Sequence, residues 1–248
     1  MSGAADAAQP APVTGAGAPV AVHLNAPLPR ALLALTFSTG LIDAASYLGL
    51  GRVFSANMTG NVVLLGFGIA GAHGLPTVSP LIAAATFVAG AGLGGLVVRR
   101  FEEPTRAFVA IVGAEGLVAA AGAVLAASAH VRANTAYGDT IVALLALAMG
   151  ARNASVRRLG VPDLSTTVLT MTLTGLTADS RLAGGSGSGT PRRAAAVAAM
   201  LAGAIAGALL LRTTLALPLA LAAALALVTC VAYARARQSG EEVRLRGG

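Results

Sequence analysis

The sequence predicts an all-α integral membrane protein with about six transmembrane helices, two broken or re-entrant helical segments and two inverted repeats. Three observations predict this class. The 248 residues are 56% hydrophobic, their mean hydropathy is +0.77, and only 11% are charged, whereas soluble domains carry about 25% charged residues. Six apolar stretches reach the roughly 20 residues that a membrane-spanning helix needs. Two further segments are apolar but interrupted, and parts of the chain repeat.

The six continuous apolar stretches divide a membrane domain from two tails. Residues 1–28 are rich in Ala, Pro and Gly and lack the basic start and apolar core of a secretory signal, so we expect a disordered tail there. The membrane domain is predicted over residues 29–235, and residues 236–248 are expected to form a cytoplasmic tail. The predicted spans are residues 31–50, 78–98, 106–128, 138–156, 194–212 and 214–234.

Two segments, 54–72 and 164–180, are apolar enough to enter the bilayer but too polar to face lipid. The first carries NMTGN, and the second is rich in threonine. Irregular backbone is tolerated at membrane depth only when it is buried in protein or lines a wet cavity. These segments therefore predict a solute site, although Asn and Thr also join membrane helices and Thr also bonds to its own helix backbone. The candidate binding residues are Asn57, Thr59, Gly60, Asn61, Thr170, Thr172, Thr174 and Gly175.

The chain repeats itself at two similar spacings. Residues 89–99 (AGAGLGGLVVR) match residues 202–212 (AGAIAGALLLR) at six of eleven positions, 113 residues apart. GLIDA at 40–44 matches GARNA at 150–154, 110 residues apart, which places Asp43 opposite Asn153. Asn153 is therefore a further binding candidate. Two halves, about 31–128 and 138–234, follow from these matches.

Each half would cross the membrane three times, so the second half would be inverted relative to the first. Inverted repeats with discontinuous helices are typical of secondary transporters. Both repeated stretches also contain a G-x-x-x-G pair, a pattern that permits close helix contact. These glycines predict packing between the two halves. They are Gly90, Gly94, Gly203 and Gly207.

Arginine supplies all 17 basic residues, and its distribution predicts the topology. If both polar segments crossed the membrane, the arginines would divide nine to eight between the two sides. If both segments returned to the side they entered, only Arg52, Arg132 and Arg212 would lie opposite the other fourteen. Such an asymmetry is typical of a cytoplasmic face. We therefore expect both termini in the cytoplasm.

Two acids within predicted spans are candidates for proton coupling, because ionisable residues inside a membrane are costly and commonly functional. Asp43 either carries a proton or cation, or serves as a structural or hydrated residue. Glu115 lies about 13 Å along a helix from Arg106, and is either protonatable in transport or a neutral acid bonded to another helix. Arg152 has three interpretations: it pairs with Asp43 or Glu115, it binds an anionic substrate, or it extends to the cytoplasmic interface. The last is preferred.

Two stretches resemble a known family. Residues 39–71 (TGLIDAASYLGLGRVFSANMTGNVVLLGFGIAG) and 152–184 (RNASVRRLGVPDLSTTVLTMTLTGLTADSRLAG), with the Gly/Ser loop that follows, are similar to the YoaK-like family of bacterial multi-pass membrane proteins. The ANMTGN and TMTLTGL motifs are fairly specific, and the resemblance extends over about residues 30–235. It implies an inner-membrane protein whose family carries a domain of unknown function. It implies no catalytic residues.

The motifs favour transport over catalysis. The chain has no H-E-x-x-H motif, no paired metal-ligand spacing and no phosphate-binding loop, so we expect no enzyme activity, no metal and no cofactor. Nucleic acid is not an expected partner, because the arginines flank apolar runs without interleaved aromatics. The expected partners are the lipid bilayer and a small polar or ionic solute. The sequence is also compatible with a homo-oligomer. The alternative is a non-transporting membrane scaffold, assembly factor or sensor.

Overall fold

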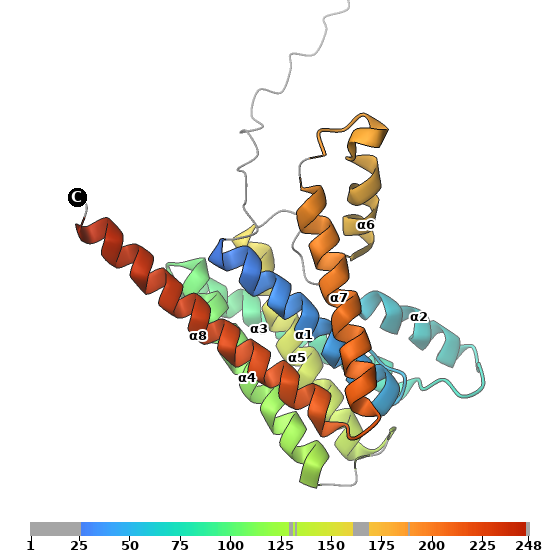
Figure 1. Cartoon of the computed structure of the whole chain (residues 1–248). Helices are drawn as coiled ribbons and strands as arrows, with labels where there is room; N and C mark the ends of the chain where they lie inside the picture. Colours follow the sequence, from blue (N-terminus) through green and yellow to red (C-terminus); the bar gives the residue numbers. More distant parts are fainter. Residues whose placement is uncertain (1–25, 129–130, 132, 161–168, 188, 247–248) are drawn as a thin grey trace, which may run out of the picture.

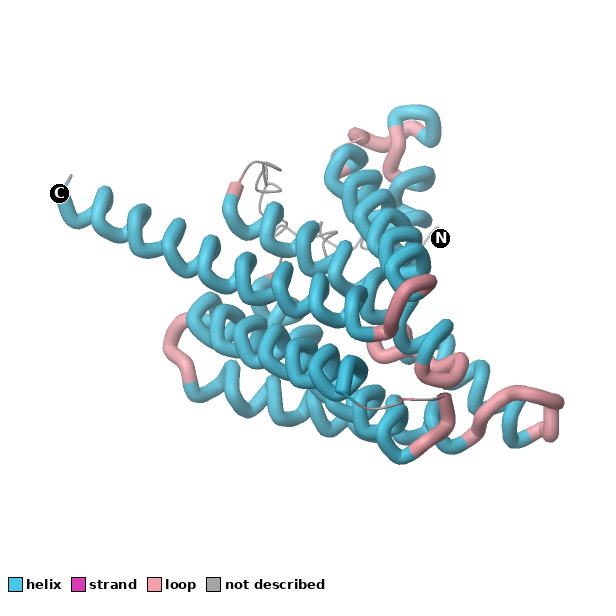
Figure 2. The backbone as a smooth tube through the Cα atoms, turned by 60° about the horizontal axis from the view of Figure 1, so that its bottom comes forward, coloured by secondary structure: helices cyan, strands magenta, loops and turns pink. Residues whose placement is uncertain are grey.

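The protein is an all-α bundle. The structure, a computed structural model, describes residues 26–128, 131, 133–160, 169–187 and 189–246, and within these ranges it contains helices and no strands (Figures 1 and 2). Six helices are long and apolar enough to cross a membrane, as the sequence predicts. They are α1 (Pro27–Gly49), α3 (Val78–Arg100), α4 (Pro104–Ser128), α5 (Ala136–Leu159), α7 (Thr190–Leu211) and α8 (Ala216–Arg246).

The helix ends depend on proline and glycine residues, which a hydropathy profile does not detect. Pro occupies one of the first two positions of α1 and of α7, where its missing N–H and fixed φ suit a helix start. Gly160 ends α5 in the left-handed conformation, with φ of 63°. The last helix, α8, continues to Arg246, so residues 236–246 of the expected tail are helical. Residues 1–25 of the other expected tail lie outside the described residues.

Two helices are too short to cross a membrane. The helix α2 (Met58–Ile69) has 12 residues, and α6 (Leu169–Ala178) has 10, followed by the short 3-10 helix η1 (Arg181–Ala183). They rise about 18 and about 15 Å at 1.5 Å per residue, against about 30 Å for a bilayer core. They lie in the two segments that the sequence marks as polar. Residues 164–168 of the second segment are outside the described residues.

Glycines bring the backbones of the crossing helices into contact. The helix α7 crosses α1 where a Cβ on Gly203 would collide with the carbonyl oxygen of Phe37. The helix α3 crosses α5 where a Cβ on Gly90 would collide with the carbonyl oxygen of Leu147. These contacts join helices from different halves of the chain, which confirms the packing that the G-x-x-x-G pairs predict.

The two crossings share one register. Phe37 and Leu147, the residues contacted, are 110 positions apart, and the contacting glycines, Gly90 and Gly203, are 113 positions apart. These are the same two spacings at which the sequence repeats. The helix α4 packs against α8, and each of them also packs against the first helix of the other half (Figure 1). The same correspondence holds for Gly94 with Ala151 and Gly207 with Leu41.

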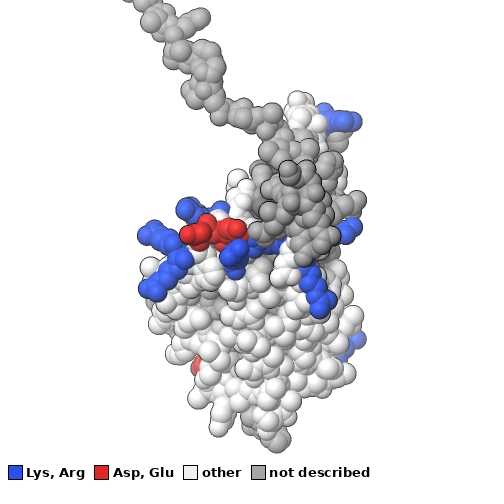
Figure 3. Space-filling view, turned by 90° about the vertical axis from the view of Figure 1, so that its left-hand side faces the viewer, with Lys and Arg blue, Asp and Glu red and all other residues white. Residues whose placement is uncertain are grey.

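The outer surface of the bundle is apolar over a broad region. Figure 3 shows charged side chains gathered toward one end of the viewed face, with an almost entirely uncharged region below them. Large apolar side chains are exposed on α3 and α7, which in a soluble protein would form a large unexplained patch. A lipid bilayer covers such a surface, so the chain is a multi-pass membrane protein. Examples are Val88, Leu96, Leu201 and Ile205.

Candidate functional site

A cavity of about 460 Å³ lies where the two short helices approach α1 and α7. This volume falls in the range of small-molecule sites, about 300 to 1,000 Å³. Both polar segments contribute to it, so residues more than 100 positions apart in the chain face the same space. The lining residues are Thr39, Asp43 and Tyr47 of α1; Phe54, Ala56 and Asn57 of the connection; Thr59, Gly60, Val63 and Leu64 of α2; Leu169 and Thr170 of α6; and Met200 of α7.

The connection after α1 turns back along that helix. Gly51 and Arg52 have positive φ values of 118° and 56°, a geometry that reverses the chain. The backbone N–H of Ala56 then donates to Oδ1 of Asp43 at 2.9 Å. Asp43 lies six residues before the end of α1, so the chain has returned along the last turns of that helix before α2 begins. The break in the apolar sequence is thus a segment folded against an acid of α1.

Asn61 holds this segment in place. Its Oδ1 accepts from the N–H of Phe54 at 2.9 Å, and its Nδ2 donates to the carbonyl oxygen of Phe54 at 2.6 Å. The side chain is fully buried and does not line the cavity. Asn57 begins α2, because its Oδ1 accepts from the N–H of Gly60 at 3.4 Å. Asn57 and Gly60 line the cavity, whereas Asn61 lies outside the lining and fixes the segment through its two hydrogen bonds to Phe54.

Asp43 presents one uncommitted oxygen. The residue is 5% exposed and lines the cavity, and its Oδ2 has no hydrogen-bond partner among the described residues. Thr39 lies one helical turn earlier on the same face of α1. Its hydroxyl donates to the carbonyl oxygen of Leu35 at 2.8 Å and accepts from Nη2 of Arg152. With its proton directed at Leu35, the Thr39 oxygen is a second acceptor beside Asp43.

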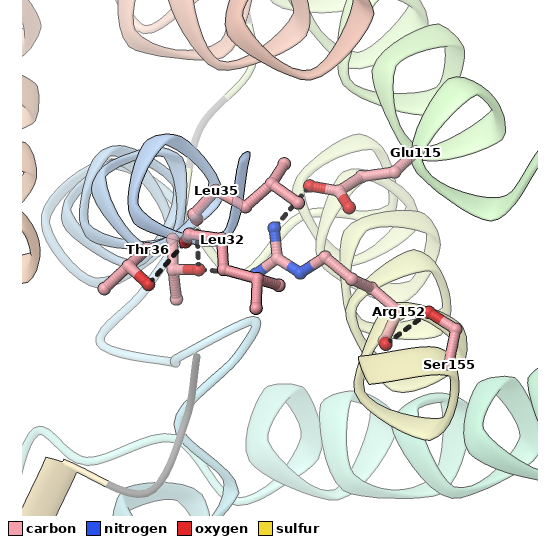
Figure 4. A network of polar contacts seen from close by, with 7 residues as sticks. Leu32, Leu35, Thr36, Glu115, Arg152 and Ser155 are labelled. Carbon is pink, nitrogen blue, oxygen red and sulfur yellow. Dashed lines mark hydrogen bonds and ion pairs between the residues drawn. The ribbon is translucent and has the colours of Figure 1, made fainter. Parts of the chain in front are cut away.

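Arg152 is fully buried and forms an ion pair in the core. Its Nη1 lies 2.7 Å from Oε1 of Glu115, which is 1% exposed. Figure 4 shows the guanidinium reaching from α5 toward Glu115 on α4, with residues of α1 beside it. The preferred interpretation, that Arg152 extends to the interface, is therefore wrong: a carboxylate 37 positions earlier in the chain holds it inside. Neither Arg152 nor Glu115 lines the cavity.

The described part of the second polar segment, residues 169–180, contributes less to the cavity than the first segment does. Thr170 lines it, but the hydroxyl of Thr174 donates to the carbonyl oxygen of Thr170 at 3.0 Å, within its own helix. Gly175 packs on Arg193, whose Nη1 donates to the Gly175 carbonyl oxygen at 2.6 Å and whose Nη2 pairs with Asp179 at 2.8 Å. These contacts tie α6 to the start of α7, as Figure 1 shows. Two other candidates, Thr172 and Asn153, do not line the cavity.

Eight of the described cavity residues are absent from the sequence-based candidates. Thr39 and Tyr47 stand four residues before and after Asp43, and this helical spacing is a signal that places all three on one face. The ring of Tyr47 stacks on Phe54 at 4.7 Å, which closes one side of the cavity. Met200 enters because α7 crosses α1 at Gly40, a contact that no local pattern reveals.

The cavity suits hydrogen bonding to a small polar solute. Its polar groups are one carboxylate, one amide, one tyrosine and three threonine hydroxyls, set among apolar side chains. Small-molecule sites commonly combine a mainly apolar wall with a few placed polar groups. No group of three or more His, Cys, Asp or Glu residues that could hold a metal ion occurs in the part of the chain that the structure describes.

Comparisons with known proteins agree with the membrane architecture. Residues 31–232 match the model of a family described as a protein of unknown function, DUF1275. The chain is 36% identical over 145 residues to the UPF0700 transmembrane protein YoaK of Bacillus subtilis strain 168. That alignment covers 58% of this chain and 64% of YoaK, which is less than two thirds of the relative's length. No solved structure matches the chain.

Proposed function

The chain belongs to the DUF1275 family of proteins of unknown function, and from that premise we propose that it is a bacterial inner-membrane transporter or permease for a small polar or ionic solute. One observation carries the proposal: a cavity of about 460 Å³, lined by polar groups of both broken segments, inside a bundle of apolar helices. Polar groups are costly in a membrane, and they are kept where they serve an ion or solute pathway.

The packing of the two halves supports an inverted repeat. Each half contributes three helices long enough to span the membrane, an odd number, so corresponding helices would run in opposite directions. The shared register of the Gly90 and Gly203 crossings supports the correspondence. In transporters of this architecture, a site at the repeat interface is exposed alternately to the two sides as the halves rock against each other.

We propose that α2 and α6 are re-entrant segments that enter and leave on one side. For the first segment, the support is the contact of Gly68 with Thr77 and the hydrogen bond from Nη1 of Arg52 to the carbonyl oxygen of Gly74 at 3.3 Å. The first contact joins α2 to the residue that precedes α3. The second joins the connection after α1 to the connection before α3. For the second segment, the support is the contact of α6 with Arg193 in the first turn of α7.

The arginine distribution supports cytoplasmic termini. Arginines occupy the last turns of α3 and of α5, which precede the connections on the proposed cytoplasmic side. Figure 3 shows the basic side chains of the viewed face gathered near one end. A positive bias of this kind marks the cytoplasmic side of bacterial membrane proteins.

Of the two buried acids, Asp43 is the one we propose for coupling to protons. Asp43 lines the cavity and has an uncommitted oxygen, so a proton there would meet the solute directly. Glu115 is paired with Arg152 and lies outside the cavity lining. A charged pair in a low-dielectric core exchanges protons reluctantly, because neutralising one partner leaves the other unpaired.

Flux measurements on purified protein in proteoliposomes test the proposal. We expect accumulation of at least one small polar solute, altered by an imposed pH gradient, and loss of that flux in Asp43→Asn without loss of folded protein. A scaffold, assembly factor or sensor predicts otherwise: no flux across a broad panel of solutes, and cavity substitutions that act on folding alone. That second result would remove the transport proposal.

A further inference from the structure

We infer that the cavity binds a small zwitterion, with a protonated amine at Asp43 and Thr39 and a carboxylate at the beginning of α2. This inference rests on the proposed function, because it names the class of solute that the same cavity would carry. It depends on where hydrogen-bond donors and acceptors stand around the space.

One wall of the cavity offers acceptors. Oδ2 of Asp43 is buried and has no hydrogen-bond partner among the described residues. The Thr39 oxygen stands one turn away, donates to Leu35 and already accepts from Nη2 of Arg152, so one of its two lone pairs remains. A buried acceptor without a partner is costly, and a charged one more so. An ammonium group supplies three N–H donors and a compensating charge, so it satisfies Oδ2 of Asp43 and has a further N–H for the remaining lone pair of Thr39.

The adjoining wall offers donors. The first N–H groups of a helix have no partner within it. In α2 the N–H of Gly60 is capped by Asn57, and the N–H of Asn61 bonds to the carbonyl of Asn57. The N–H of Thr59 remains, together with the Thr59 hydroxyl, and this residue lines the cavity. A helix N-terminus carries a partial positive charge and binds carboxylates and phosphates readily.

The charges select between classes of solute. Arg152 and Glu115 neutralise each other in the core. Among the described residues that line the cavity Asp43 alone is charged, and it stands beside the positive end of α2. A simple cation would bring no anionic group to the N-terminus of α2, and a simple anion would be repelled by the Asp43 carboxylate. A zwitterion places opposite charges against both walls.

Asp43 also has a structural role, which the test must separate from binding. Its Oδ1 holds the N–H of Ala56 and so docks the chain before α2. That role leaves Oδ2 unexplained. The Asp43→Asn variant keeps an acceptor for Ala56 and removes the charge. The corresponding residue of the other half, Asn153, already carries an amide. The matched control is Asp139→Asn, the same change on α5 outside the cavity.

The experiment measures binding to the purified full-length protein by isothermal titration calorimetry. The zwitterionic probes are glycine, L-alanine, L-leucine and β-alanine, and the one-ended probes are propionate and ethylamine. We expect at least one zwitterion to bind, and each one-ended probe to bind about tenfold more weakly or worse, because each lacks one charged hydrogen-bonding group. We expect Asp43→Asn to weaken zwitterion binding by about 10- to 100-fold, and not to weaken propionate binding, because the variant removes a negative charge that repels this anion. Asp139→Asn should change neither.

Three results would overturn the inference: no zwitterion binds, a one-ended probe binds as tightly as any zwitterion, or Asp43→Asn binds zwitterions normally. Counterflow in proteoliposomes separates this failure from failure of the proposed function. Flux of some other solute without zwitterion binding would overturn the inference of a zwitterionic solute but would still support transport. Zwitterion binding without flux of any solute would support the site and overturn transport.

Discussion

Asp43 on α1 and Asn153 on α5 each follow a glycine by three residues, Gly40 and Gly150, in helices that cross α7 and α3 through matching backbone contacts. Only Asp43 lines the cavity. The glycine contacts set how the helices pack, and they recur in both halves. The acid is not repeated. The two halves therefore share a packing register, while Asp43 of the first half has no acidic counterpart in the second.

The largest expected effect comes from breaking the shared packing. In Gly90→Leu and Gly203→Leu the new side chain meets a backbone carbonyl of the crossing helix, which cannot move aside as a flexible side chain would. Overpacking typically costs about 1 to 3 kcal/mol, and we expect more here because the obstacle is main chain. Both variants should yield little folded protein, measured as the monodisperse fraction in size-exclusion chromatography.

Gly92→Leu is the control for both, because no atom lies within 4 Å of a Cβ at that position. It should purify like the unmodified protein. If one of the two crossing glycines accepted leucine and the other did not, the halves would not share the same dependence on close contact.

The next effect concerns a contact that lacks a counterpart in the other half. Arg152 corresponds by the 110-residue spacing to Ile42, an apolar core residue. Arg152→Met leaves Glu115 buried without its partner, which should cost about 3 to 5 kcal/mol of unfolding free energy. The double variant Arg152→Met/Glu115→Leu removes both charges and should recover most of that loss. Thermal unfolding followed by circular dichroism measures both, and a double variant no more stable than Arg152→Met would contradict the pairing.

A smaller effect tests how far the two halves are interchangeable at Asp43. Asp43→Asn keeps the acceptor for Ala56, so its stability should change by less than about 1 kcal/mol. Asp43→Leu leaves the Ala56 N–H without its acceptor, and it should lose about 1 to 3 kcal/mol. The same unfolding measurement compares them. Equal losses in the two variants would show that the charge, rather than the hydrogen bond, docks the segment.

The smallest effect lies outside the membrane-spanning helices. Glu103, between α3 and α4, bonds to Arg237 and pairs with Arg106 at 3.3 Å. The hydrogen bond from Arg237 is the main cause that lowers the pKa of Glu103 below its ordinary value of 4.5. Because the pKa of Glu103 is lowered in the folded protein, its ionised carboxylate stabilises the fold above pH 4.5. This stabilisation is lost as the pH falls through the folded pKa. Arg237→Gln should be slightly less stable at neutral pH, and the difference should shrink in acid. A constant difference across the titration would contradict this role.

Hydropathy predicted the six long helices because crossing a bilayer requires continuous apolar length, and their ends shifted by only a few residues except in α8. The extension to Arg246 was missed because its polar turns carry no hydropathy signal. The two short helices fall within the polar segments, since breaks in an apolar run are visible locally.

The candidate site was predictable only where its residues share a local segment. Asn57, Thr59 and Gly60 lie within four positions of the chain and do line the cavity with Asp43. Asn61 belongs to the same cluster but faces Phe54, because a side chain's direction depends on how the segment folds back. The pairing of Arg152 with Glu115 was one of the alternatives that the sequence left open, and choosing it depends on which helix lies opposite α5.

The inverted arrangement of the halves is the central claim, and cysteine labelling tests it directly. On a Cys230→Ala background, which removes the lone native cysteine, single cysteines replace Arg52, His73, Arg158 and Thr190. They are probed with a membrane-impermeant maleimide in intact and permeabilised cells. The account predicts that positions 52 and 73 react from outside, and that 158 and 190 react only after permeabilisation. If the members of either pair reacted from opposite faces, that segment would cross the membrane and the inverted arrangement would be wrong.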